Sequence, residues 1–322
     1  MSEAAKTRRQ TLAEVSASLW GKAGLVDVIQ AIADGAQRVA QRVQSAAIEG
    51  TLGATGDINV QGEAVQHLDA LGSDIFVETL INSGGVVAIG SEELDEAIIA
   101  DTGNDVGFMV QMDPVDGSSN VDVAVSIGSI FGIWHNDMPG PISESALLRP
   151  GKEQVAAAYV VYGTSTMLVV AIEGNVQGFT LDSTTGDFLL THPDIRIPER
   201  CEYYSANDGN FRKWDGSTQQ AVAALQSRYS LRYVGSLVCD FHRNILKGGI
   251  YVYPADPTYP EGKLRLMYEA NPLGYIAEQA GGAASTGAER ILDIQPESPH
   301  QRTPLVIGNR DAVEDTVSLI SS

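Results

Sequence analysis

The spacing of hydrophobic residues changes along the chain. The part before residue 121 shows helical spacing followed by two short apolar runs. Over residues 25–48 and again over residues 65–81, apolar side chains recur every three or four positions. This spacing predicts two amphipathic helices. The runs "GGVVAIGSEELDE" and "VGFMVQM" follow, and each leads directly into acidic residues. We therefore predict two buried strands that end in carboxylates.

The middle of the chain, residues 121–190, has the pattern of consecutive short strands. The candidate strands are "VDVAVSIGSIFGIW", "VAAAYVVYG", "TMLVVAIEG", "VQGFTLD" and "GDFLLT". Turns rich in Gly, Ser and Asn separate them, which favours antiparallel pairing.

After "THPDIRIPER" helical patterns return, over residues 219–229, 238–246 and 264–279, and they alternate with the strands "GIYVYP" and "TPLVIGN". This change predicts a boundary near residues 192–200. We expect an N-terminal domain of residues 1–195 that carries most metal ligands and any allosteric site. A C-terminal domain of residues 196–322 is expected to bind the substrate.

The charge balance restricts the possible partners. The 322 residues include 41 acidic and 21 basic side chains, which gives a formal charge of -20. Binding to a nucleic-acid backbone requires clustered Lys and Arg, so we expect no nucleic-acid partner. An anionic substrate remains possible, because surface charge is screened beyond ~8 Å at physiological salt. Metal ions or a few local cations would then have to overcome the acidic field.

The sequence also indicates a location. No apolar run approaches the ~20 residues that span a bilayer, and the N-terminus lacks the apolar core of a signal peptide. Cys201 and Cys239 are too few for a disulfide framework. We expect a cytoplasmic protein with reduced cysteines and no membrane partner.

Candidate chemistry begins where the two apolar strands end. Glu92 and Glu93 follow one strand, and Asp113 and Asp116 follow the other. Strand ends are where α/β proteins place ligands. Four carboxylates in one pocket would repel one another unless divalent cations neutralised them, and oxygen ligands suit Mg²⁺ or Mn²⁺. The Val115 carbonyl is a further candidate oxygen ligand.

The residues that follow, "GSSN", have the properties of a phosphate site. Gly117 permits close approach of the backbone, and the amides of Ser118 and Ser119 can point N–H groups at an anion. Metals on one side and amides on the other describe metal-dependent phosphoryl transfer. Simpler readings exist, because Asp-Gly beside Pro is usually a turn and adjacent glutamates usually lie in solvent. The whole run "DPVDGSSN" is more specific than its parts.

Longer blocks of sequence carry a family resemblance from about residue 61 to residue 282. They are "GEAVQHLD", "IGSEELDE", "DPVDGSSNVD", "SIGSIFGIW", "AYVVYGTSTMLVVA", "RYVGSLVCDFHRNILKGGIYVYP" and "GKLRLMYEANPLGYIAEQAGG". In order and spacing they resemble class I fructose-1,6-bisphosphatases, within the lithium-sensitive, metal-dependent sugar phosphatase superfamily. Inositol monophosphatases share the DPxDG core but lack the last two blocks.

The resemblance implies a fold, an assembly and an activity. The fold is α/β, layered α-β-α-β-α, with mixed sheets, helices between them and the active site between two subdomains. The implied assembly is a homotetramer. The implied reaction is Mg²⁺-dependent hydrolysis of the 1-phosphate of fructose 1,6-bisphosphate to fructose 6-phosphate by metal-activated water, in gluconeogenesis or the Calvin cycle.

The resemblance also implies site residues. It implies ligands for two or more Mg²⁺ ions (Mn²⁺ being possible): Glu63, Glu92, Asp113, Val115, Asp116 and Glu269. It implies catalytic roles for Asp69 and Glu93 at the attacking water and for Arg265 beside the phosphoryl group. It implies contacts to the substrate from Asp116, Gly117, Ser118, Ser119, Asn207, Arg232, Tyr233, Tyr253 and Lys263. Among these, Arg232 would reach into the neighbouring subunit's site.

Two alternatives stay open beside this reading. Asn210 replaces a tyrosine that often contacts the 6-phosphate in the family, so sedoheptulose 1,7-bisphosphate is an alternative or additional substrate. A non-catalytic, metal-dependent sugar-phosphate sensor is a second alternative. Without the family, Tyr233 and Tyr253 would be read as core tyrosines, and we interpret His242 as structural.

The sequence departs from the AMP-inhibited relatives at three places. The start of the first long helix has "GKAGLVDV" instead of a Gly-Thr-Gly-Glu type element, Gly107 and Phe108 replace Lys-Tyr, and His135 replaces an arginine. We therefore predict weak or absent inhibition by AMP. The cysteine-bearing insertion of light-regulated chloroplast forms is also missing, so we expect no thioredoxin control.

Overall fold

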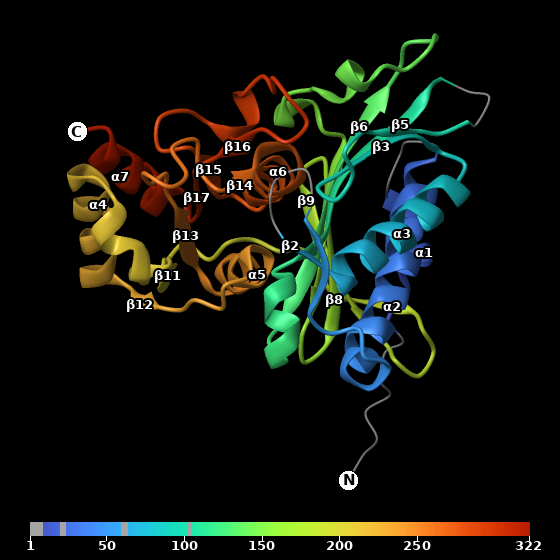
Figure 1. The fold of residues 1–322 in the computed structure, drawn as a ribbon, viewed down its shortest axis with the longest axis horizontal. Coiled ribbons are helices and arrows are strands. Elements are labelled where there is room, and N and C mark those ends of the chain that lie inside the picture. The colour runs from blue at the N-terminus through green and yellow to red at the C-terminus, as the bar shows by residue number, and fades with distance from the viewer. Residues whose placement is uncertain (1–8, 20–23, 59–63, 102–104) are drawn as a thin grey trace.

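Layers of helices alternate with layers of sheet in the computed structural model, which describes residues 9–19, 24–58, 64–101 and 105–322. Across this described part of the chain, the order is helices, large sheet, helices, second sheet, helices (Figure 1). The expected layered α/β fold with mixed sheets is confirmed. No helix among the described residues is long and apolar enough to cross a membrane.

Eight strands of the described chain form the large sheet, in the order β10-β9-β8-β7-β6-β5-β3-β4. Their bounds are β3 (Val86–Ser91), β4 (Ile98–Ile99), β5 (Gly107–Asp116), β6 (Ile127–Asn136), β7 (Ala156–Tyr162), β8 (Thr166–Ile172), β9 (Asn175–Leu181) and β10 (Phe188–His192). From β5 to β10 every neighbouring pair is antiparallel, as expected, whereas β3 pairs with β5 in parallel.

The second sheet has the order β12-β11-β13-β17-β15 within the described residues. Its strands are β11 (Tyr203–Ser205), β12 (Ser230–Leu231), β13 (Gly249–Tyr253), β15 (Ala283–Ser285) and β17 (Leu305–Gly308). The described residues also form two small strand pairs: β1 (Ala54–Ile58) with β2 (Ala64–Gln66), and β14 (Leu264–Arg265) with β16 (Arg302–Thr303).

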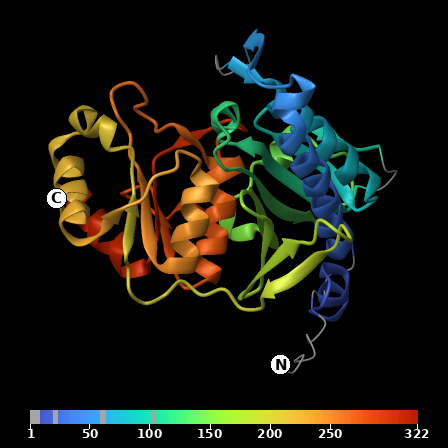
Figure 2. The same ribbon diagram turned by 90° about the horizontal axis from the view of Figure 1, so that it is seen from below.

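The helices cover the sheets on both faces. Their bounds are α1 (Leu12–Leu19), α2 (Leu25–Glu49), α3 (His67–Asn82), α4 (Gly216–Arg228), α5 (Leu237–Lys247), α6 (Asn271–Gln279) and α7 (Arg310–Ile320). The first three lie on one outer face and α4 and α7 on the other, while α5 and α6 lie between the sheets and contact both (Figures 1 and 2). The middle layer therefore joins the two halves of the chain.

Strand β5 is covered on both sides by these layers. All ten of its residues are buried, including Asp113 and Asp116. Strands with both faces covered show continuous apolar runs instead of alternation, which explains why "VGFMVQM" has no polar face. The same strand thus places two carboxylates deep between the layers.

Two sequence-based assignments need correction. Residues 121–126 were expected to begin a strand, but the short 3-10 helix η1 (Ser118–Val123) ends there and β6 begins only at Ile127. Residues 264–279 were expected to form one helix. Instead, β14 is followed by a turn of π-helix, η5 (Leu266–Ala270), and then by α6. Pro272 lacks the N–H that a regular helix would use at this point.

The connection between the sheets runs from the end of β10 at His192 to the start of β11 at Tyr203. It is fixed by backbone bonds from Ile195 to Val176 in β9 and from Ile197 to Ala280 after α6. The division into domains at residues 195 and 196 stays a prediction.

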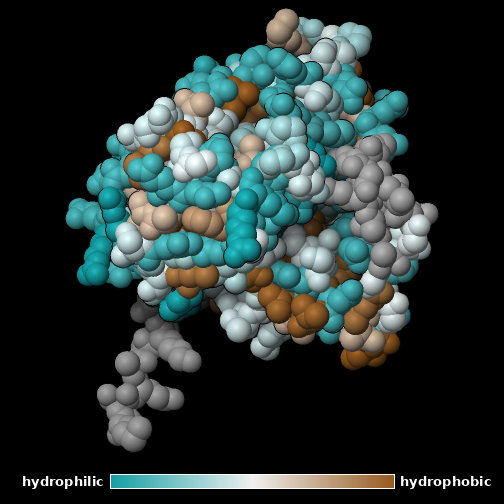
Figure 3. Space-filling model, turned by 60° about the vertical axis from the view of Figure 1, so that its left-hand side comes forward, coloured by the Kyte–Doolittle hydropathy of each residue, from teal (hydrophilic) through white to brown (hydrophobic). Residues whose placement is uncertain are grey.

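The surface is mostly hydrophilic, but hydrophobic residues gather along the lower edge of the face in Figure 3. The large hydrophobic side chains that are exposed in the described chain include those of Ile48, Leu52, Val123 and Val125. Gly53, which follows Leu52, donates its N–H to the carboxylate of Asp122, which precedes Val123, at 2.9 Å. The loop after α2 and the end of η1 are thus connected.

His242 on α5 gives the middle layer a dependence on pH. Its Nδ1 lies 2.8 Å from the hydroxyl of Tyr159, and burial, together with the charge of nearby His192, lowers its pKa to about 4. An unfolded histidine titrates near ~6.5, so acid protonates the unfolded chain first. The stabilisation from neutral His242 is complete above that value and is lost as the pH falls towards 4.

We predict that lowering the pH from 7 to 5 reduces the unfolding free energy of both the unsubstituted protein and the His242→Gln variant. The reduction should be roughly 2 kcal/mol larger in the unsubstituted protein. The measurement is urea denaturation of both proteins at the two pH values. His67→Gln, which alters an exposed histidine at the start of α3, is the control and should follow the unsubstituted protein. If all three proteins lost the same unfolding free energy between pH 7 and pH 5, His242 would not be the source of the pH dependence.

Candidate active site

A pocket of about 230 Å³ opens where the large sheet meets the middle layer. Its lining residues are Asp69, Glu92, Glu93, Asp113, Val115, Asp116, Gly117, Ser118, Ser119, Tyr233, Gly235, Leu237, Tyr251, Tyr253, Lys263, Leu264, Arg265 and Glu269. Most residues singled out from the sequence therefore lie around one space, although they come from distant parts of the chain. The roles predicted for them remain predictions.

The end of β5 departs from regular pairing at the motif itself. Asp113 pairs with Ile130 and Asp116 with Gly128, and the register shifts between the two pairs. Such a bulge redirects side chains at the edge of a sheet. The Ser129 hydroxyl donates to the Pro114 carbonyl at 2.6 Å. The irregular strand end is therefore held in place from the neighbouring strand.

Gly117 turns the chain from β5 into η1. Its φ is +79°, in the left-handed region, and a Cβ built there would lie 2.6 Å from the Cβ of Ser236. Both observations require glycine at this position. The 3-10 helix η1 begins at the next residue, Ser118.

Asp116 lies at the N-terminus of α5. Its Oδ2 accepts bonds from the Ser236 hydroxyl at 2.6 Å and from the Val238 N–H at 2.8 Å. The Leu237 N–H reaches Oδ1 at 3.3 Å. The first N–H groups of a helix lack partners within the helix and carry partial positive charge, so this position stabilises an anion. Ser236 is not among the residues predicted from the sequence.

The sequence around Ser236 does contain a helix N-cap signal. In "GSLVCD" a serine stands immediately before an apolar helical pattern, which is typical of an N-cap. In the structure, Ser236 is the N-cap of α5 and its hydroxyl accepts from the Cys239 N–H. It therefore serves both its own helix and the Asp116 carboxylate.

Glu269 reaches the pocket from the π-helical turn η5. Such wide turns inside helices occur frequently at functional sites. One Glu269 oxygen accepts the backbone N–H of Arg265. The Arg265 guanidinium is only 2% exposed and lies 3.4 Å from the Glu92 carboxylate. A buried cation therefore lies within the acidic group.

Burial and like charges act together on the carboxyl groups. Burial raises the pKa of Asp113 well above its usual range, and the charges of Glu92, Asp116 and Glu269 raise it further. Burial likewise raises the pKa of Glu269, with added contributions from Glu92 and Asp116. Burial also raises the pKa of Asp116, but the bonds from Ser236 and α5 oppose this effect. A bound cation would offset the cost of charge at all three groups.

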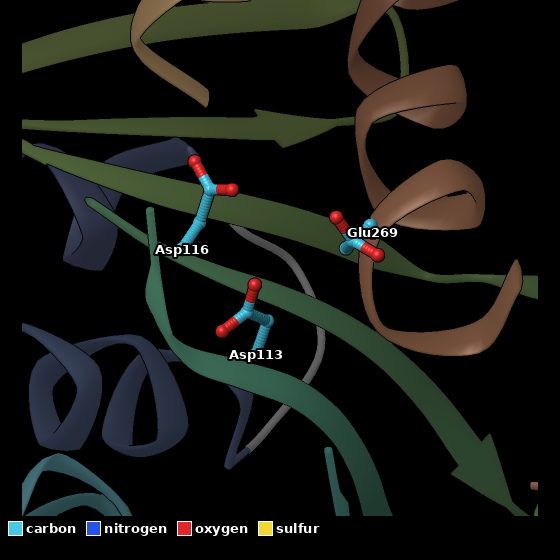
Figure 4. A group of neighbouring side chains, drawn as sticks. All are labelled: Asp113, Asp116 and Glu269. Carbon is cyan, nitrogen blue, oxygen red and sulfur yellow. The ribbon is translucent and has the colours of Figure 1, made fainter. Parts of the chain in front are cut away.

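The geometry of these acids fits a metal ion. One carboxylate oxygen from each of Asp113, Asp116 and Glu269 lies within 4.8 Å of the others, and the side chains converge on one space (Figure 4). Carboxylate oxygens are the ligands that hard divalent cations prefer. Glu92, near Arg265, lines the same pocket. Glu63, also predicted as a ligand, lies outside the described residues.

Two predicted substrate contacts lie elsewhere in the described chain. Asn207 precedes the 3-10 helix η4 (Asp208–Lys213), outside the pocket lining. The exposed Arg232 lies over the ring of Tyr203, with 5.3 Å between its guanidinium carbon and the ring centre. Its predicted reach into a neighbouring subunit needs an exposed side chain, and the observed position provides one.

Comparisons with known proteins agree over almost the entire chain. The family model described as "Fructose-1-6-bisphosphatase, N-terminal domain" matches residues 8–193, and "Fructose-1-6-bisphosphatase, C-terminal domain" matches residues 197–321. The chain belongs to the fructose-1,6-bisphosphatase family. The resemblance seen in the sequence blocks is thereby confirmed.

Individual members of the fructose-1,6-bisphosphatase family cover most of the chain. A class 1 fructose-1,6-bisphosphatase of Synechococcus is 48% identical over 292 residues, which is 89% of this chain and 88% of that protein. A cytosolic fructose-1,6-bisphosphatase of Brassica napus is 45% identical, covering 88% and 86%. The crystal structure of Leishmania major fructose-1,6-bisphosphatase in its holo form superposes with a TM-score of 0.93 at 36% identity, covering 98% and 100%.

We predict that excess Mg²⁺ raises the thermal midpoint of the protein and that Asp113→Asn abolishes this rise. A ligand at a hundredfold excess over its Kd stabilises by ~2.7 kcal/mol. In EDTA the variant should be at least as stable as the unsubstituted protein, because it removes a buried charge that its neighbours repel. The measurement is differential scanning calorimetry with and without Mg²⁺.

Asp74→Asn is the matched control, since Asp74 is an exposed carboxylate on α3. It should keep the full response to Mg²⁺. An Asp113→Asn protein that responds to Mg²⁺ as strongly as the control would show that the ion binds elsewhere.

Proposed function

We propose that this chain hydrolyses the 1-phosphate of fructose 1,6-bisphosphate and releases fructose 6-phosphate and inorganic phosphate. The observation that carries the proposal is the convergence of three buried carboxylates with Lys263 and Arg265 on one pocket. It occurs in a chain that is 44–50% identical to proteins named fructose-1,6-bisphosphatase. The activities of other members of the sugar phosphatase superfamily receive less support for this chain.

Divalent ions are part of the proposal. Glu92, Asp113, Asp116, Glu269 and the Val115 carbonyl would hold Mg²⁺ or Mn²⁺, with Glu63 as a further ligand. Bound ions of this kind neutralise charge and polarise a phosphate ester. The ligand set contains oxygen atoms alone, which favours Mg²⁺ or Mn²⁺ over softer metals.

The chain's own residues would orient the reacting phosphate. Ser118, Ser119 and Arg265 line the pocket, and their amides, hydroxyls and guanidinium would donate to phosphate oxygens. Asp69 and Glu93 are the proposed acceptors for a proton from the attacking water. Asp69 is buried in the first turn of α3, where its Oδ2 accepts the Gln66 N–H at 3.0 Å. This bond fixes the direction of its carboxylate.

The 6-phosphate end of the substrate must be bound, but no bond breaks there. Lys263, Tyr233 and Tyr253 line the pocket and provide one cation and two hydroxyls for the 6-phosphate and the sugar. Tyr253 stacks on Tyr251 with 6.3 Å between ring centres, so its ring is supported. Fixed contacts of this kind orient a substrate for reaction at the opposite end. Asn207 and Arg232 are proposed to complete this end in the assembly.

The two alternatives receive less support. Sedoheptulose 1,7-bisphosphate would use the same reacting end, but the similar curated proteins are named for the fructose substrate. A sensor without turnover would not need Asp69 and Glu93 beside the metal ligands, and both line the pocket.

We also propose a homotetramer in the cytosol. The exposed apolar side chains of Ile48, Leu52, Val123 and Val125 would be covered in an assembly. The plant relatives are named as cytosolic enzymes.

We predict Mg²⁺-dependent release of phosphate from fructose 1,6-bisphosphate by the purified protein, and loss of this activity after exhaustive chelation. Asp116→Ala should lower kcat by about a thousandfold or more, because it removes a ligand from the reacting end. The measurement is phosphate release with each sugar bisphosphate. Faster turnover of sedoheptulose 1,7-bisphosphate would favour the alternative, and binding without turnover would favour the sensor.

We further predict that AMP inhibits weakly or not at all. The Phe108 ring packs edge-on against His135, with 4.8 Å between ring centres, and lies near Gly24 at the start of α2. A Cβ at Gly107 would lie 2.7 Å from the Gly85 carbonyl, so this backbone accepts no phosphate-binding side chain. The measurement is a titration of AMP, in which strong cooperative inhibition below a millimolar would refute the prediction.

A further inference from the structure

The segment 232–236 carries part of the pocket but has little regular structure of its own. It connects the two-residue strand β12 with α5, and Tyr233 and Gly235 within it line the pocket. Its first residue is held by one backbone bond, from the Arg232 N–H to the Tyr204 carbonyl at 2.9 Å. Something else must fix the conformation of the remaining residues.

Asp240 supplies this support from inside α5. Its side chain is completely buried, at 0% exposure. Both of its carboxylate oxygens accept the Val234 N–H at 2.9 Å, and Oδ2 also accepts the Gly235 N–H at 3.1 Å. A carboxylate that accepts backbone N–H bonds determines the position of that backbone. The peptide groups on either side of Val234 are therefore fixed by one side chain.

Arg243, one turn later on α5, connects Asp240 to its surroundings. Its Nη2 donates to Asp240, to the Arg232 carbonyl at 3.1 Å and to the Ser205 hydroxyl at 3.1 Å. One guanidinium thus joins α5, the segment 232–236 and β11. The ion pair also provides the positive charge that a buried carboxylate requires.

We propose that Asp240 and Arg243 are positioning residues that set Tyr233 and Arg232 for the non-reacting phosphate of the substrate. This inference rests on the proposed function. Among the described residues that line the pocket, neither Asp240 nor Arg243 is included, so they act through the backbone of the segment 232–236. Their effect should therefore appear in binding of the distal phosphate and not in the chemical step.

The opposite end of the same segment is held by a different carboxylate. Ser236 donates to Asp116, which belongs to the reacting end. The segment is thus anchored by Asp116 at its last residue and by Asp240 at its middle. This separation predicts that substitutions at Asp240 leave the metal requirement unchanged.

The decisive experiment compares substrates with and without the distal phosphate. For fructose 1,6-bisphosphate, Asp240→Asn should raise KM about tenfold, which corresponds to the loss of one charge-assisted contact, while kcat and the half-activating Mg²⁺ concentration stay within about twofold. For fructose 1-phosphate, the variant and the unsubstituted protein should have the same kcat/KM within about twofold. An equal loss with both substrates would overturn the inference.

A direct binding measurement provides a second readout. The Kd of fructose 6-phosphate, measured by calorimetry, should rise about tenfold in Asp240→Asn. Arg243→Lys keeps the charge but loses the planar guanidinium, and a smaller rise is expected. If Asp240→Asn fails to fold, Arg243→Lys decides the question, and an unchanged Kd in Arg243→Lys would then refute the inference.

The matched control is Asp315→Asn, which breaks the exposed ion pair between Asp315 on α7 and Arg228 on α4, at 2.9 Å. It should change neither KM nor Kd. An unsubstituted protein that releases no phosphate from fructose 1,6-bisphosphate would refute the proposed function itself. An active protein whose Asp240→Asn variant binds fructose 6-phosphate normally would refute only the positioning role.

Discussion

Repulsion among buried carboxylates is the constraint on which the rest of the structure depends. Asp113, Asp116 and Glu269 bring oxygens within 4.8 Å of one another. Burial raises the pKa of each group, and like charges raise the pKa of Asp113 and Glu269 further. A charged group loses its hydration on burial, and neighbouring charges of the same sign increase the cost. The surrounding chain must therefore hold these groups rigidly and offer compensating positive charge.

The compensation comes from backbone as much as from side chains. Asp116 receives two N–H groups and a hydroxyl from the start of α5, whereas Glu269 receives the Arg265 N–H and lies near its guanidinium. Backbone dipoles cannot move away from the charge as a flexible side chain can, so they also fix its position. Because α5 and η5 both belong to the layer between the sheets, that layer supplies Glu269 and the groups that compensate the acids, as well as joining the halves.

The sequence predicted the elements whose signal is local. Residues 25–48 show helical spacing, and α2 follows it almost residue by residue. Prediction from the sequence was wrong where long-range contacts determine the local structure. Leu264 and Arg265 form a strand because they pair with β16, which lies far along the chain, and no periodicity shows this partner. Glu92, Glu93, Asp113 and residues 115–119 were predicted from the local pattern, and the other predicted pocket residues through the resemblance. Ser236 and Asp240 were not predicted, because the role of Ser236 depends on a bond to the distant Asp116 carboxylate and that of Asp240 on bonds to nearby backbone N–H groups.

The turn before α5 links the two ends of the pocket through two adjacent pairs of backbone N–H groups. Asp116 uses those of Leu237 and Val238, and Asp240 uses those of Val234 and Gly235. A displacement of this turn would therefore alter both carboxylates at once. Gly117 makes this arrangement still tighter, because its Cα lies where any Cβ would collide with Ser236. The motif on β5 and the turn before α5 can keep their positions only together, although more than a hundred residues separate them.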